Sequence, residues 1–142
     1  MQRVVIDTNL YVDWLNEGQH EAVLFQREAV KYLSAVVLME LLAGAFSARD
    51  RRLVREVTSA FARVRRILVP TVSIYEEAGD VLRRLQKSQG YTLASAYGLV
   101  NDVLIALSAR SIGATVITQN QRDFVAIQTI RPFKLALVPQ TA

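Results

Sequence analysis

The stretch Val4-Val5-Ile6-Asp7-Thr8-Asn9 decides the fold class of this chain. Its three apolar residues predict a short strand over residues 4–6, with an aspartate directly at the carboxyl end. Similar short apolar segments recur at residues 31–33, 67–69, 115–117 and 135–138. Strands that are apolar on both faces are typical of a parallel sheet covered on both sides. The sequence therefore predicts an α/β domain with a central, mostly parallel sheet flanked by helices.

Helical segments alternate with these strands. The expected helices cover residues 8–16, 21–28, 35–46, 50–65, 73–87, 101–111 and 121–125. Ser34 and Asn101 are placed to cap two of them, and Ser73 begins a capping box. Residues 90–100 are expected to be loop or loosely helical. Because no repeat or flexible linker divides the sequence, we expect a single domain over residues 1–142.

The 142 residues include no cysteine and one histidine. The lack of cysteine excludes disulfides, thiolate nucleophiles, iron–sulfur clusters and thiolate zinc sites. His20 lies in a polar stretch, and we expect it to be a surface residue. A metal bound by this chain must therefore be held mostly by oxygen, which favours magnesium, manganese or calcium.

No segment of the sequence has the length and apolarity of a membrane span. The longest stretch without a charged residue, 88–101, is shorter than the ~20 apolar residues that such a helix needs. The apolar run at the N-terminus stops at Asp7, too early for a secretory signal. We therefore expect a cytoplasmic protein with no membrane partner.

The net charge of +4 is concentrated in one segment. Seven arginines lie there against two acidic residues: Arg49, Arg51, Arg52, Arg55, Arg63, Arg65 and Arg66. Apolar residues at helical spacing in the same segment indicate an amphipathic helix. Its basic face is either solvated or a sequence-independent contact for phosphates, in which case Arg51, Arg52 and Arg55 are the candidate residues.

Two aspartates follow predicted strands. Asp7 comes directly after the first strand, and Asp123 comes six residues after Ile117. Ligands of open parallel sheets bind beyond the carboxyl ends of the strands, so both side chains are expected at that edge. Each also has a structural explanation, because Asp7 with Asn9 could start a helix and Asp123 could pair with Asn120 as a cap.

Two further acids lie in apolar helical segments. Glu40 is the only charged residue in residues 35–46, a segment that is apolar all round and is therefore expected to be buried. A buried carboxylate is costly unless it is paired or binds a metal, and an arginine partner is the competing explanation. Asp102 precedes an apolar run, although an acid in a first helical turn is also stabilised by the helix dipole.

Four carboxylates at one edge of a sheet would repel one another strongly. A divalent cation removes that repulsion, activates water and stabilises the oxyanion that develops in phosphodiester hydrolysis. The residues therefore predict a magnesium or manganese site that hydrolyses nucleic acid.

The sequence resembles PIN-domain ribonucleases and, more narrowly, the VapC-like toxins of bacterial and archaeal toxin–antitoxin pairs. Four blocks carry the resemblance in order along essentially the whole chain: Val4-Val5-Ile6-Asp7-Thr8-Asn9, Ser34 with Glu40-Leu41-Leu42-Ala43-Gly44, Asn101-Asp102 with Leu104-Ile105-Ala106, and Thr118-Gln119-Asn120 with Asp123-Phe124. The family often has threonine where this chain has Val37, so one hydrogen bond beside the metal site is not expected here.

The resemblance implies a PIN-like three-layer fold and endonucleolytic cleavage of RNA. It assigns Mg²⁺ or Mn²⁺ binding to Asp7, Glu40, Asp102 and Asp123. It places Asn9, Thr118 and Asn120 at polar positions beside the site, where they would position the acids or the substrate. It also implies a cognate antitoxin and a homodimer as partners, with the arginine-rich helix available to RNA or antitoxin.

Two other functions remain open on the sequence. An aspartyl-phosphate phosphatase would use Asp7 as its nucleophile, but that chemistry commonly needs a second aspartate where this chain has Asn9. No glycine-rich phosphate loop or nucleophile elbow is present. A non-catalytic module that binds nucleic acid through metal is the second alternative, and the presence of all four acids argues for the enzyme.

Overall fold

The computed structural model describes residues 1–94 and 96–140, with the side chain of Tyr97 left out. Its five strands are β1 (Gln2–Ile6), β2 (Ala29–Ser34), β3 (Ile67–Leu68), β4 (Thr115–Thr118) and β5 (Lys134–Leu137). They form one sheet in the order β3-β2-β1-β4-β5, and every neighbouring pair is parallel. The predicted parallel α/β sheet is confirmed.

Strand β1 lies in the middle of the sheet, with Val5 opposite Tyr32 of β2 and Val116 of β4. Val5 and Val116 are fully buried because helices cover both faces at this point. Strand β5, at the edge, is largely exposed, unlike the buried strand that its apolar sequence suggests. An edge strand has a neighbour on one side only, which leaves its side chains more accessible.

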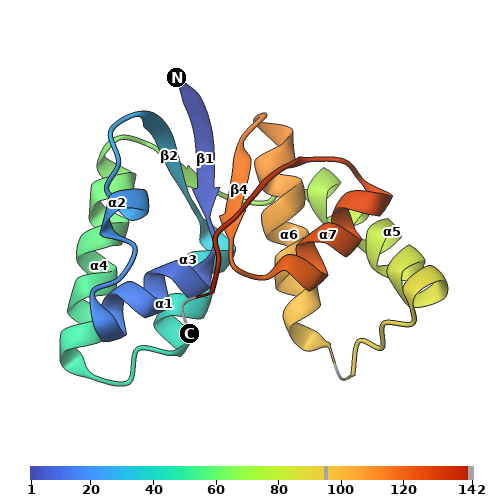
Figure 1. Ribbon diagram of the computed structural model, residues 1–142, viewed down its shortest axis with the longest axis horizontal. Helices are drawn as coiled ribbons and strands as arrows, with labels where there is room; N and C mark the ends of the chain where they lie inside the picture. Colours follow the sequence, from blue (N-terminus) through green and yellow to red (C-terminus); the bar gives the residue numbers. More distant parts are fainter. Residues whose placement is uncertain (95, 141–142) are drawn as a thin grey trace.

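The described residues form seven helices around the sheet: α1 (Thr8–Glu17), α2 (Glu21–Leu24), α3 (Ala35–Ala43), α4 (Ala48–Arg63), α5 (Val72–Gln89), α6 (Tyr97–Ser111) and α7 (Gln121–Ile130). Figure 1 shows α1, α2 and α4 on one side of the central strands and α5, α6 and α7 on the other. This arrangement confirms the predicted three-layer architecture. No helix of the described residues has both the length and the apolarity to cross a membrane.

Two predicted helix caps are wrong. Helix α5 begins at Val72, where the Thr71 hydroxyl accepts a hydrogen bond from the backbone of Ile74, so Ser73 lies inside the helix. Helix α6 begins at Tyr97, and Asn101 is therefore an internal residue rather than its cap. The residues before Asn101 join the helix because Leu99 is buried in the core. Ser95, within the segment predicted as loop, lies outside the described residues.

Helix α3 confirms its predicted cap but not its predicted burial. The Ser34 hydroxyl accepts hydrogen bonds from the backbone N–H groups of Val36 and Val37. One face of the helix packs into the core, whereas Met39 and Leu42 on the other face are 53% and 44% exposed. The apolar sequence all round the helix therefore does not reflect burial all round.

Other helix boundaries also differ from the prediction: α3 ends three residues early, at Ala43, and α4 begins and ends two residues early, at Ala48 and Arg63. Helix α2 stops four residues early, at Leu24, and α7 runs five residues further than predicted, to Ile130. The extension of α7 has a packing cause, since Ala126 and Ile127 are buried against the core.

Candidate active site

A hollow of about 400 Å³ lies beyond the carboxyl ends of β1 and β4. We call it the acidic hollow, because its lining includes all four predicted acids. The lining residues are Asp7, Thr8, Asn9, Val12, Asp13, Glu40, Gly98, Asp102, Asn120 and Asp123. These residues come from α1, α3, α6 and α7 and from the loops that precede α1 and α7, so the fold brings together segments far apart in the sequence.

Asp7 connects the end of β1 to α1. One carboxylate oxygen, Oδ1, accepts a hydrogen bond from the backbone of Thr8 at 2.8 Å, and Oδ2 accepts one from Thr118 Oγ1 at 2.7 Å. Burial raises the pKa of Asp7, the bonds from Thr118 and Thr8 oppose that rise, and the charge of Glu40 adds to it. Asp7 therefore caps the N-terminus of α1, which is the structural role considered for it, and it also lines the acidic hollow.

Glu40 faces the hollow from α3. Its Oε1 accepts a hydrogen bond from Thr8 Oγ1 at 2.7 Å. Among the described ion pairs none involves Glu40, so the competing explanation of an arginine partner is wrong. Val37, which stands where the resemblance leads one to expect a threonine, is fully buried in the core. The hydroxyl that donates to Glu40 comes from Thr8.

Asp102 is the acid whose surroundings reveal the cluster. It is the sixth residue of α6, so it is not an acid of a first helical turn, and it is 8% exposed. Burial, followed by the charges of Asp7, Asp123 and Glu40, raises its pKa from 3.8 to about 9. Because all three other carboxylates act on Asp102, the four acids share one electrostatic site.

Asn120 joins two of the acids. Its Nδ2 donates hydrogen bonds to Asp102 Oδ2 at 3.0 Å and to Asp123 Oδ2 at 3.1 Å. Its Oδ1 accepts the backbone N–H of Asp123 at 3.4 Å, which confirms the predicted cap of α7. Thr118 Oγ1 accepts the backbone N–H of Asn120 while donating to Asp7, so both predicted polar residues position acids of the site.

Three residues of the site were not predicted from the sequence. Thr8 supports Glu40, Asp13 lines the acidic hollow, and the Tyr91 hydroxyl donates to Asp123 Oδ1 at 2.9 Å. Thr8 lies within the first block of the sequence and could have been considered there. Tyr91 carries no sequence signal, because it reaches Asp123 from a loop 32 residues away.

The prediction of His20 as a surface residue is wrong. Its side chain is 9% exposed, and its Nε2 lies 2.9 Å from Asp13 Oδ2 and 3.3 Å from Gln119 Nε2. A left-handed backbone conformation, with φ of 67°, carries the chain from α1 into α2 at this residue. The polar neighbours of His20 in the sequence gave no sign of its distant partners.

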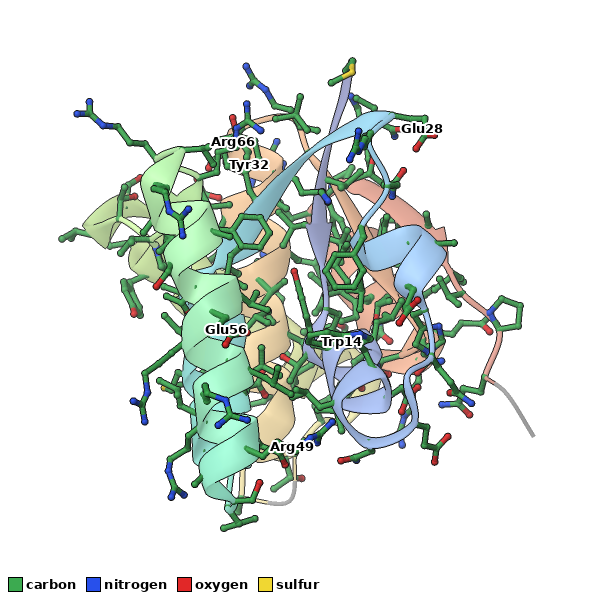
Figure 2. All side chains as sticks on the ribbon, turned by 90° about the vertical axis from the view of Figure 1, so that its left-hand side faces the viewer. Trp14, Glu28, Tyr32, Arg49, Glu56 and Arg66 are labelled. Carbon is green, nitrogen blue, oxygen red and sulfur yellow. The ribbon has the colours of Figure 1, made fainter. Side chains whose placement is uncertain are left out.

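The arginine-rich helix is α4, which faces the viewer in Figure 2. Arg51 Nη1 donates to the backbone oxygens of Ala45 and Phe46 at 3.2 and 3.0 Å, so this arginine fixes the loop between α3 and α4. Arg52 and Arg55 are exposed and line a shallow depression on α4 together with Glu56, Ser59 and Arg63. The structure therefore separates Arg51, with a structural contact, from the other two.

One known protein family matches this sequence over most of its length. The family model for the PIN domain matches residues 4–129.

This chain belongs to the PIN domain family.

Solved structures with the fold of this PIN domain include several VapBC complexes. VapBC-1 from nontypeable Haemophilus influenzae has a TM-score of 0.68 and 23% identity, over 96% of this chain and 98% of that one. DNA-bound VapBC from Salmonella typhimurium has a TM-score of 0.69 and 22% identity over the same shares. VapBC-5 from Mycobacterium tuberculosis has a TM-score of 0.67 and 22% identity, over 97% of this chain and 100% of that one. No curated protein matches the sequence.

No cationic side chain of the described residues pairs with the acids of this PIN domain. None of the described ion pairs involves Asp7, Glu40, Asp102 or Asp123, and their hydrogen-bond donors are hydroxyl, amide and backbone groups. Buried or half-buried carboxylates in such a cluster are strongly disfavoured unless a cation joins them.

The donor set of the acidic hollow consists of atoms that suit a hard divalent cation. All candidate ligands are oxygens, and Asn9 Oδ1 is a buried acceptor with no partner among the described residues. No three carboxylate or imidazole groups of the described residues surround a single point closely enough to hold an ion. What fits a divalent cation is the chemistry of the donors: oxygen is the ligand that Mg²⁺ and Mn²⁺ prefer, and magnesium usually keeps several waters and takes only one or two carboxylates.

Proposed function

We propose that this PIN domain is a cytoplasmic, magnesium- or manganese-dependent endoribonuclease and the toxin of a toxin–antitoxin pair. The observation that carries the proposal is the acidic hollow, which carboxylates from four separate segments line together. Asp7, Glu40, Asp102 and Asp123 are the residues that would hold the cation. Bound there, a divalent ion would supply an activated water and stabilise the negative charge that develops at the phosphate.

The chain's own residues fix the geometry of the acids. Thr118 and the backbone of Thr8 hold the two oxygens of Asp7, and Asn120 holds Asp102 and Asp123 at a common amide nitrogen. Burial and Asp123 raise the pKa of Tyr91, which keeps its hydroxyl protonated as a donor to Asp123. Carboxylates oriented in this way offer their remaining lone pairs to the hollow, where the cation and the phosphate would meet.

An aspartyl-phosphate mechanism is less well supported. Asp7 would have to attack phosphorus, but both of its oxygens accept hydrogen bonds, which lowers their nucleophilicity. Asn9 stands where a second aspartate would act as acid and base, and an amide cannot exchange the proton. Hydrolysis by water needs neither group.

The toxin assignment and the partners rest on the kind of structure that this chain resembles. The similar structures are VapBC complexes, and one is described as a member of a family of toxin–antitoxin systems. By analogy we propose a cognate antitoxin and a homodimeric assembly for this chain. The net charge of +4 favours a nucleic acid as the substrate, because a basic surface attracts the phosphate backbone. The choice of RNA rests on the resemblance to VapC-like toxins.

The decisive experiment is cleavage of single-stranded RNA by purified protein freed of any antitoxin. We expect cleavage with added Mg²⁺ or Mn²⁺ and its loss in EDTA. Asp7→Asn should abolish cleavage without unfolding the protein, because it removes one ligand charge and keeps the shape of the side chain. Asp80→Asn, on α5 away from the acidic hollow, is the matched control and should retain activity.

Undiminished cleavage in excess chelator would refute the metal-dependent mechanism. RNA binding that requires metal, without cleavage under any condition, would favour the non-catalytic module instead. A full-activity, folded Asp7→Asn variant would remove that residue from the site.

A further inference from the structure

A second, more enclosed hollow of about 110 Å³ opens beside the acidic hollow. We call it the side pocket. The two share Val12 of α1 and Glu40 of α3, so they adjoin each other at these residues. Its other lining residues are Leu15, Asn16, Leu41, Gly44, Ala45 and Asp50. A substrate held in the acidic hollow therefore has a recess next to it, at the crossing of α1 and α3.

The floor of the side pocket is apolar. Leu15, Leu41 and Ala45 line it, and their exposed fractions are only 9%, 4% and 7%. Gly44 keeps the recess open, since it has no side chain to fill it. Its φ of −97° is ordinary for any residue, and an added Cβ would meet only the Glu40 backbone oxygen, at 3.7 Å. Backbone conformation therefore does not explain this glycine.

The rim of the side pocket is polar and held in place. Asp50 Oδ1 accepts a hydrogen bond from Arg49 Nη1 at 3.0 Å, and the same nitrogen lies 3.3 Å from the backbone oxygen of Leu15. The backbone of Asp50 is fixed in turn by the Ser47 hydroxyl. Asn16, one turn along α1 from Val12, adds an exposed amide. The pocket thus combines a flat apolar floor with acceptor groups at its edge.

We propose that the side pocket binds a guanine base of the RNA, next to the phosphate that is cleaved. This inference rests on the proposed ribonuclease function and names its specificity. A phosphate is disfavoured, because Glu40 lines the pocket, is balanced by none of the described ion pairs, and would repel it. A base has an apolar face for the floor and polar edge groups for the rim, as in most recognition of single-stranded RNA.

Guanine fits the rim better than the other bases. The Asp50 carboxylate only accepts hydrogen bonds, and guanine presents two adjacent donors, N1–H and the N2 amino group. Uracil offers a single N–H between two carbonyl oxygens, which a carboxylate repels. Adenine and cytosine each offer one amino group beside an acceptor nitrogen, so they match the carboxylate less well.

The test compares binding of two RNA oligonucleotides that differ by a single amino group. Fluorescein-labelled octamers that contain one guanosine, or inosine in its place, are titrated with protein in Ca²⁺ and followed by fluorescence anisotropy. Wild type should bind the guanosine octamer about tenfold more tightly, as expected for one hydrogen bond to a charged group. Asp50→Asn should bind both octamers equally, because its amide no longer matches two adjacent donors.

A second variant tests the shape of the pocket. Gly44→Leu should fill the recess and weaken binding of the guanosine octamer to the level of a uridine octamer. Gly79→Leu, at an exposed position of α5 with nothing near its Cβ, is the matched control and should bind like wild type. Thermal unfolding of each variant, with Asp80→Asn as the control for loss of an arginine-paired aspartate, verifies that the fold is kept.

Cleavage mapping on a randomised RNA pool separates this proposal from the proposed function. Cuts by wild type should cluster beside guanosine, and Asp50→Asn should lose that preference while still cutting. Cleavage without guanosine preference, or a preference that survives in folded Asp50→Asn, would overturn the proposal that the side pocket binds guanine. The nuclease function would stand. Failure of wild type to cut any RNA, with the guanosine preference in binding retained, would overturn the nuclease function and leave the pocket standing.

Discussion

Asp102 shows how the residues of a carboxylate site depend on one another. Its neighbours Asp7, Asp123 and Glu40 each raise its pKa, beyond the effect of burial. The four acids could be predicted because each follows a strand or interrupts an apolar helix, which are local features. The donors that hold them, Thr8 and Tyr91, could not be assigned, because a hydrogen bond to a distant carboxylate leaves no local pattern.

Asp102→Asn should stabilise the metal-free protein, and the gain should grow with pH. The folded-state pKa of Asp102, about 9, lies above its ordinary value of 3.8. The folded protein therefore binds the extra proton between these values, and wild-type stability falls as pH rises through that window. Asparagine does not titrate, so that part of the fall disappears.

Thermal unfolding in EDTA at pH 4.5 and pH 8 checks this expectation. The variant and wild type should unfold at similar temperatures at the lower pH and separate at the higher one. Because the pKa of Asp7 is also raised, some decline of stability with pH should remain in the variant. A variant less stable than wild type at pH 8 would show that Asp102 is charged and stabilising in the free protein.

The elements show where local sequence rules succeed and where packing overrides them. Ser34 caps α3 as its sequence predicts, because the cap needs only residues three apart. Helix α6 starts four residues before its predicted cap, without a side-chain hydrogen bond at its N-terminus. Burial of Leu99 stabilises that first turn, and burial depends on partners that a local pattern does not contain.

The exposed arginines of helix α4 are candidates for contact with the phosphates of RNA. Arg52, Arg55 and Arg63 share its exposed face, at helical spacing. If they contact phosphates, replacing all three by serine should weaken RNA binding. The slope of log affinity against log salt should flatten by roughly 0.7 for each lost contact to a single strand. Salt titrations of RNA binding measure the slope directly.

Arg51→Ser is the internal control for this helix. Because Arg51 binds backbone oxygens of the loop between α3 and α4, its loss should lower the unfolding temperature and barely change the salt slope. An unchanged slope in the triple variant, with normal antitoxin affinity, would identify the other three arginines as a solvated face. An unchanged slope with weakened antitoxin affinity would assign them to the antitoxin instead.

At the scale of the whole molecule, the fold persists although little of the sequence does. The similar VapBC structures share only 22–23% identity with this chain over nearly its full length. A parallel sheet with a buried central strand needs apolar residues at the right positions, and many sequences satisfy that pattern. Surface features are not fixed in the same way, which is why the exposed apolar residues of α3 did not follow from the sequence pattern.

The last prediction concerns those exposed residues and the expected homodimer. Met39, Leu42 and Phe46 are 53%, 44% and 88% exposed, and their spacing of three and four residues places them along one side of α3 and its end. Several large apolar side chains exposed on one side of an element are a feature of interaction sites in soluble proteins. We expect the antitoxin-free protein to sediment at twice its 15.9 kDa chain mass.

The double variant Leu42→Glu, Phe46→Glu should sediment as a folded monomer, because burying two carboxylates at the contact is costly. Val64→Glu with Val125→Glu changes the same charge at exposed positions just after α4 and on α7, and should leave the dimer intact. If the wild-type protein sediments as a monomer, the expected homodimer is wrong. If the α3 variant still sediments as a dimer, the dimer contact lies elsewhere.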